Sequence, residues 1–97
     1  MVKSFKVHEL KTIEPFYSDV KSGIKSFEVR INDRNFQVGD FLVLKQYDQK
    51  NKIYSGDAIL REIKYILTQN DYPDGLMNGY VILGLKERDG IYGKFNS

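Results

Sequence analysis

The charged side chains of residues 23–30 have the types and spacing of a ligand-binding site. Gly23 is followed by Lys25, Glu28 and Arg30. Lysine and arginine can hold a phosphate or a base edge, and the planar fork of arginine can make two hydrogen bonds or stack on a base. The glutamate can hold the arginine in position or accept hydrogen bonds from an exocyclic amine. The alternative is a set of ordinary exposed ion pairs, which contribute little to stability.

Three more residues are candidates for the same site. His8 can stack on a base or carry a proton near neutral pH, and its alternative role is a partly buried histidine bonded to a backbone carbonyl. Lys11 is expected to face solvent, and Arg34 can reach a ligand from the rim of a turn in which Asp33 bonds backbone NH groups. We therefore expect ligand or RNA contacts from these residues: His8, Lys11, Lys25, Glu28, Arg30 and Arg34.

Composition restricts the chemistry. The 97 residues include no cysteine and one histidine, so the usual zinc ligands and the pairs of a Ser–His or Cys–His nucleophile are missing. The sequence contains no tight acidic cluster and no glycine-rich phosphate loop. We expect neither a metal nor a cofactor.

The charge is small and evenly spread. Residues 1–48 hold eight basic and seven acidic side chains, residues 49–97 hold seven and six, and the net charge is +2. Strongly electrostatic nucleic-acid binders are usually more basic, so any nucleic-acid site is expected to be a local pocket. No apolar run has the length of a signal peptide core or a membrane helix, and we expect a cytoplasmic protein without membrane contact.

Hydrophobic periodicity predicts one domain with about five strands and one helix, a small mixed α+β fold that is mainly β. The helix, at residues 14–22, has Thr12 as a possible cap, Phe16, Tyr17 and Val20 at helical spacing, and Gly23 as its stop. A loss of phase near Arg61 and Glu62 indicates a bulge or bend, as barrels have at their corners. The expected strands are residues 4–10, 26–31, 41–47, 54–68 and 79–85.

The strand at 26–31 alternates cleanly. Phe27, Val29 and Ile31 are expected to enter the core, which leaves Glu28 and Arg30 on the other face. A closed or nearly closed barrel would hide the sheet edges. We expect the domain to span residues 1–97, with its core at about 4–86 and a polar, loosely held tail at 87–97.

Taken together, these motifs resemble the ASCH domains, a branch of the PUA-like superfamily. The resemblance rests on Gly23-x-Lys25-x-x-Glu28-x-Arg30, followed by Val38-Gly39-Asp40. His8-x-Leu10-Lys11 and Asn32-Asp33-Arg34 add to it and are similar to a small bacterial and phage branch. The resemblance implies a PUA-like β-barrel of about five to six strands with one or two short helices. It also implies a cleft beside the signature strand that binds RNA or a modified nucleoside.

Other members of the group imply two alternative functions. One bacterial relative is an amidohydrolase of N4-acetylcytidine that uses a lysine, a threonine nucleophile and a glutamate. Lys25 matches the lysine, but Glu28 stands at the threonine position, and Ser26 lies nearby without occupying it. If the protein is an enzyme, Lys25 and Glu28 are its catalytic candidates; we expect a binding module instead. Some ASCH domains belong to transcriptional coactivators (activating signal cointegrator), which implies a protein-interaction domain as the other alternative.

Overall fold

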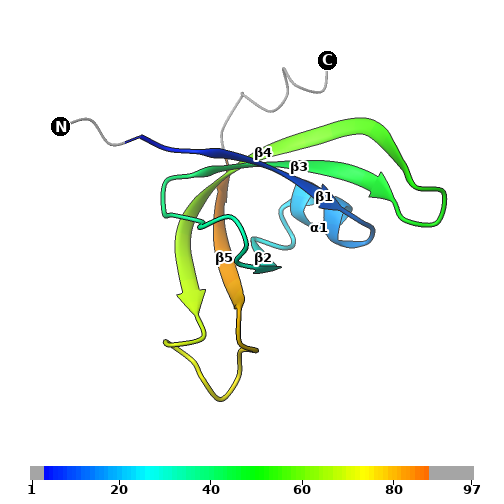
Figure 1. Ribbon diagram of the computed structural model, residues 1–97. Coiled ribbons are helices and arrows are strands. Elements are labelled where there is room, and N and C mark those ends of the chain that lie inside the picture. Colours follow the sequence, from blue (N-terminus) through cyan, green and yellow to red (C-terminus); the bar gives the residue numbers. More distant parts are fainter. Residues whose placement is uncertain (1–3, 88–97) are drawn as a thin grey trace.

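One curled sheet forms the body of the protein in the computed structural model, which describes residues 4–87 (Figure 1). Within these residues the sheet has five strands and is accompanied by one short helix. The predicted fold class, mixed α+β and mainly β, is therefore confirmed, and the sheet has the shape of a half-barrel. The elements are β1 Val7–Thr12, α1 Phe16–Ser22, β2 Phe27–Ile31, β3 Phe41–Asp48, β4 Ile53–Thr68 and β5 Tyr80–Glu87.

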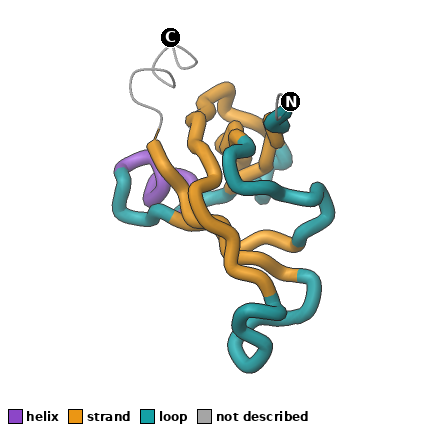
Figure 2. Tube along the Cα trace, turned by 90° about the vertical axis from the view of Figure 1, so that its left-hand side faces the viewer, coloured by secondary structure: helices purple, strands orange, loops and turns teal. Residues whose placement is uncertain are grey.

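The strand order is β1-β3-β4-β5-β2, so β1 and β2 are the two edges. β1 runs parallel to β3, and the other neighbours are antiparallel. The long strand β4 joins the two halves of the sheet, because its first part pairs with β3 and its second part with β5. The register between β4 and β5 shifts between Ile63 and Tyr65, close to the bulge predicted at Arg61 and Glu62. The resulting curl is visible in both views (Figures 1 and 2).

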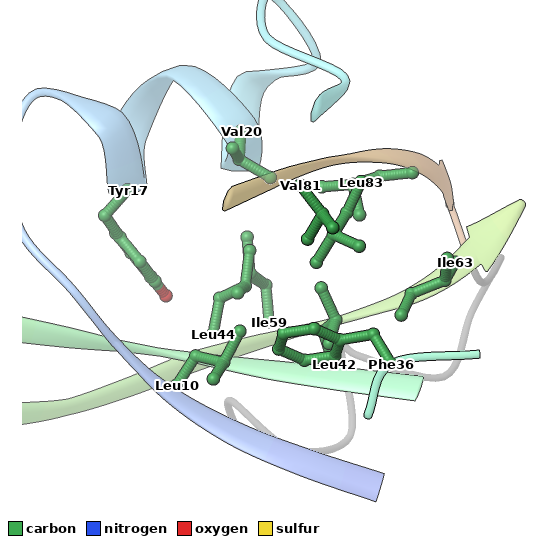
Figure 3. Packing of buried hydrophobic residues seen from close by; sticks show 11 residues of the cluster. Leu10, Tyr17, Val20, Phe36, Leu42, Leu44, Ile59, Ile63, Val81 and Leu83 are labelled. Carbon is green, nitrogen blue, oxygen red and sulfur yellow. The ribbon is translucent and has the colours of Figure 1, made fainter. Parts of the chain in front are cut away.

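The core lies between the concave face of the sheet and α1 (Figure 3). Tyr17 and Val20 of α1 point toward side chains of four strands and toward Phe36. Each fully buried aliphatic or aromatic side chain of this kind contributes about 1.5–3 kcal/mol of transfer free energy. The sheet contributes Leu10, Leu42, Leu44, Ile59, Ile63, Val81, Leu83 and Leu85.

The helix ends as predicted and begins differently. Gly23 follows the last turn with φ of 90°, and its NH donates to the carbonyl of Val20 at 3.1 Å. The predicted cap, Thr12, is wrong because this residue is the last one of β1. The first turn is instead bonded by Glu14, whose carboxylate accepts from the backbone NH of Ser18 at 3.0 Å.

The edge strand β2 turns the opposite face inward from the one predicted, and β1 differs from the prediction in where it begins. In β1, which begins at residue 7 rather than 4, His8 and Leu10 are buried and Val7 is exposed. In β2, Glu28 is only 4% exposed, whereas the apolar residues on its other face, Phe27, Val29 and Ile31, are 44–52% exposed.

The physical reason lies in the strand pairing. Glu28 is opposite Leu83 of β5, and Arg30 is opposite Val81. Directly opposed residues of an antiparallel pair share one face of the sheet. Because Leu83 and Val81 are core residues, Glu28 and Arg30 must also point inward.

Three smaller findings complete the fold. In the turn after β2, Asn32 rather than Asp33 accepts a backbone hydrogen bond, from Phe36 at 3.1 Å. In residues 4–87 no helix has the length and apolar character needed to cross a membrane. Of the predicted loose tail, residues 88–97 lie outside the described part of the chain, and Glu87 ends β5.

Candidate ligand-binding cleft

A cleft of about 270 Å³ opens between the two edges of the half-barrel. The end of β1 and the start of α1 form one side, and β2 forms the other. Polar and apolar side chains are mixed around it, as in many small-molecule sites. The lining residues are Lys11, Thr12, Ile13, Phe16, Glu28, Val29 and Arg30.

Glu28 is the buried carboxylate of this cleft. Its Oε2 accepts a hydrogen bond from Nζ of Lys25 at 3.1 Å. Its Oε1 lies 3.6 Å from Nη2 of Arg30, an ion-pair distance, but has no hydrogen-bond partner among the described residues. A buried polar atom without a hydrogen bond costs about 1–3 kcal/mol. Oε1 is therefore a buried acceptor that is not used within the described residues.

Arg30 links the two edge strands. Its Nη2 donates to Oγ1 of Thr12 at 3.2 Å, and the Thr12 hydroxyl donates to the carbonyl of Leu10 at 3.3 Å. β1 and β2 do not pair through their backbones. The Arg30–Thr12 bond therefore holds the two sides of the cleft at a fixed separation, while the arginine side chain stays about one-quarter exposed.

Lys25, which precedes β2 in the chain, is held next to Glu28 by its own hydrogen bonds. Its Nζ donates to the carbonyl of Phe27 at 2.6 Å as well as to Glu28, and it lies 4.8 Å from the centre of the Phe27 ring. The carboxylate of Glu28 thus has one cation on each side. The Lys25–Glu28 contact is a largely buried, hydrogen-bonded ion pair. It therefore differs from the exposed ion pairs that contribute little to stability.

Four of the six predicted site residues are found together. Lys11, Glu28 and Arg30 line the cleft, and Lys25 binds Glu28. Lys11 is exposed as expected, with its Nζ 4.2 Å from the centre of the Tyr47 ring.

Arg34 lies away from the cleft, in the turn after β2. It does not line the cleft, and its Nε is 3.8 Å from a carboxylate oxygen of Asp33 in an exposed pair. Its predicted role at the rim is not supported by this position.

His8 also lies away from the cleft, in a buried pair. Its Nε2 is 2.8 Å from Oδ2 of Asp40, and its ring packs edge-on against Phe36. Of the roles considered for it, stacking on a base does not match this buried position, and the ring bonds a carboxylate rather than a backbone carbonyl. Burial raises the pKa of Asp40, but hydrogen bonds from His8 and from the backbone NH groups of Lys6 and Gln37 outweigh it and hold that pKa below the usual value.

Sequence reasoning missed three polar or aromatic residues that matter here. Thr12 faces the cleft, but its place before Glu14 and Pro15 indicated a helix cap. Phe16 has helical spacing with the core, yet it lines the cleft and is 46% exposed. Arg61 was considered only as part of a loss of phase in its strand, but it is buried and donates to the carbonyls of Val20 and Leu60 at 3.0 and 2.9 Å.

Comparison with known proteins places the chain in a family. The model of the family described as "Domain of unknown function (DUF3850)" matches residues 7–85. The match covers most of the chain and includes every residue of the cleft, so the chain belongs to this family. No curated protein matches the sequence.

Proposed function

We propose that this member of the DUF3850 family binds a nucleobase of single-stranded RNA, or of a modified nucleoside, in the cleft beside β2. One observation carries the proposal: Glu28 lines the cleft and is a buried carboxylate whose Oε1 has no hydrogen bond among the described residues. An N–H group on a base edge has the geometry and polarity that such an oxygen needs.

The neighbours of Glu28 support a base rather than a simple cation. Lys25 and Arg30 already supply two positive charges, so a further cation would be repelled. A neutral exocyclic amine gives a hydrogen bond without adding charge. Arg30 can at the same time donate to a ring nitrogen or carbonyl beside the amine, because its guanidinium has donors left over.

The rim of the cleft has groups for the rest of a nucleotide. Phe16 exposes nearly half of its surface beside the cleft, and an exposed aromatic ring is a stacking platform for a base. Lys11 lies on the β1 side, where it can approach a phosphate. This arrangement fits a small local site on a chain with a net charge of only +2.

The proposal includes the wider assignment to the ASCH branch of the PUA-like superfamily. The signature Gly23-x-Lys25-x-x-Glu28-x-Arg30 and the half-barrel support it. A cytoplasmic location accompanies it, since RNA and nucleosides occur there and the chain has no cysteine.

An NMR titration tests the proposal. Isotope-labelled protein is titrated with cytidine, short single-stranded RNA and matched DNA at two salt concentrations. We expect shifts at Lys25, Glu28, Arg30 and Thr12, and none at His8. Arg30→Ala should weaken binding by about 1–3 kcal/mol if the guanidinium makes a bidentate contact.

The matched control is Arg34→Ala, which removes the same charge from an exposed position outside the cleft. It should leave the affinity unchanged. Glu28→Gln, which keeps the size of the side chain, should change the preference among bases because it introduces a donor. Unshifted cleft residues with all three ligands would refute the proposal and favour a protein partner.

A second candidate function, amidohydrolysis of an acylated pyrimidine nucleoside, has one observation in its favour. Thr12 places a hydroxyl in the cleft next to Arg30, although Glu28 occupies the position of the nucleophile in the related enzyme. The test is incubation with N4-acetylcytidine, followed by chromatography. Deacetylation that Thr12→Val and Lys25→Ala both abolish would establish it, and no turnover by the folded protein would exclude this substrate.

A further inference from the structure

We propose that a second pocket, on the other side of Lys25, binds a phosphate group of the ligand whose base occupies the cleft. The pocket has a volume of about 280 Å³ and lies between the end of α1 and the strands β4 and β5. The inference rests on the proposed function and extends it, because it makes the ligand a nucleotide or an RNA strand rather than a free nucleoside.

The charges around this pocket favour an anion. Among residues 4–87, four basic residues line it, and one acidic residue, Glu87, accompanies them. Lys64 and Lys86 are exposed, and within residues 4–87 neither makes an ion pair. Their ammonium groups are therefore available as point charges for a phosphate. The basic residues are Lys25, Arg61, Lys64 and Lys86.

Arg61 places a positive charge at a fixed position in the lining of the pocket. Its guanidinium is 3% exposed and bonds the carbonyl of Val20, in the last turn of α1, as well as the carbonyl of Leu60. Free carbonyls at the end of a helix would repel an anion. Arg61 covers one of them with a positive charge. Its contact with Glu87 is longer, at 3.5 Å, and the glutamate is about half exposed.

Lys25 connects the two pockets. It lines the basic pocket, and its Nζ binds Glu28 at the edge of the cleft. The Ser26 hydroxyl, exposed beside it, offers a neutral donor on the same side. A ligand with its base against Glu28 and its phosphate next to Lys25 would therefore contact both pockets. A nucleoside without a phosphate would use only one.

Calorimetry with four probes tests the inference: cytidine, cytidine 5′-monophosphate, a three-nucleotide RNA without terminal phosphates, and inorganic phosphate. We expect the monophosphate to bind roughly tenfold more tightly than cytidine. The double variant Lys64→Ala/Lys86→Ala should remove most of this difference, since only Lys25 and Arg61 then remain, and leave cytidine binding unchanged. Both lysines are exposed, so the variant should remain folded.

The control is Lys6→Ala, which removes one positive charge from an exposed side chain that lines neither pocket. It should leave the affinity for the monophosphate unchanged, so that the effect of the double variant is local. The trinucleotide then separates the sources of the phosphate: tighter binding than cytidine indicates a phosphodiester, and equal binding indicates a terminal monoester.

Two results would count against different parts of the reasoning. Equal affinities for cytidine and the monophosphate, with NMR shifts at Glu28 and Arg30, would overturn the phosphate pocket and leave the proposed function standing. Shifts at Gly23, Ser26 and Lys86 with inorganic phosphate and the monophosphate, but none at Glu28 with any probe, would support the pocket and refute base binding.

Discussion

Replacing Asp40 with alanine tests whether the His8–Asp40 pair is structural. The Asp40 side chain is 2% exposed and accepts three hydrogen bonds. They come from the backbone NH of Lys6 at 3.0 Å, from Nε2 of His8 at 2.8 Å and from the backbone NH of Gln37 at 3.1 Å. One carboxylate thus ties the entry of β1 and the loop before β3 to the buried histidine.

The expected loss of stability is about 3–5 kcal/mol. Hydrogen bonds to a charged group contribute about 1.5–3 kcal/mol each, but Lys6 and Gln37 are exposed residues, and water can replace part of what their NH groups lose. The His8 contact is buried, and breaking a buried pair by removing one partner costs about 3–5 kcal/mol. Domains of this size are stable by about 5–15 kcal/mol in total. The variant should therefore be folded but fragile.

Urea and thermal unfolding give the measurement. For a domain of this size about 1 kcal/mol corresponds to roughly 4–8 °C, so the midpoint should fall by at least about 12 °C. Asp33→Ala is the control, since this carboxylate lies in the preceding turn, is exposed and pairs only loosely with Arg34. It should change stability by less than about 0.5 kcal/mol. A loss below about 1 kcal/mol for Asp40→Ala would refute the reasoning.

The pH dependence provides an independent check. The folded pKa of Asp40 is lowered from the ordinary value of 3.8. A lowered pKa means that its contribution is fully present above the unfolded pKa and is lost as the pH falls through the folded pKa. The difference in stability between the wild type and Asp40→Ala should therefore be constant near neutral pH and shrink below pH 3.8. A difference that persists at lower pH would contradict the assignment.

Two further predictions concern the elements that position the pockets. Arg61→Ala should destabilise the protein by at least about 2 kcal/mol, because the buried carbonyls of Val20 and Leu60 lose their donor. Arg61→Lys should have an intermediate stability. Urea unfolding of both variants checks this, and equal stability of the wild type and the two variants would contradict it. Gly23→Ala should destabilise the protein by about 1 kcal/mol or more because φ is 90° there, although a Cβ would meet no atom within 4 Å. Thermal unfolding measures the effect. A midpoint at or above that of the wild type would show that backbone strain at this position does not lower stability.

Local chemistry of the chain made several features predictable. The strands and the helix have characteristic periods, and Gly23 ends the helix because it readily adopts positive φ. Glu28 and Arg30 are two residues apart on a strand, so they must share a face whichever way the strand turns. The charged residues around the cleft and the fold class could therefore both be predicted from the sequence.

The face that each edge strand turns inward was decided by tertiary pairing. Alternation separates Phe27 and Val29 from Glu28 and Arg30, but it cannot say which set meets the core. β2 pairs with β5, which lies about fifty residues later in the chain, and this pairing sets Glu28 opposite Leu83. The general preference for apolar residues inside is overridden because this pairing turns Glu28 inward, where Lys25 and Arg30 compensate its charge.

The partners of polar side chains were also decided only by the tertiary structure. His8 and Asp40 are 32 residues apart, Thr12 and Arg30 are 18 apart, and Arg61 and Val20 are 41 apart. No local pattern joins such residues, because the half-barrel brings them together through the β1–β3, β3–β4, β4–β5 and β5–β2 pairings. The sequence by itself thus determined the elements and the charged strand. The three-dimensional arrangement decided that His8 belongs to the core and that Thr12 and Phe16 belong to the cleft.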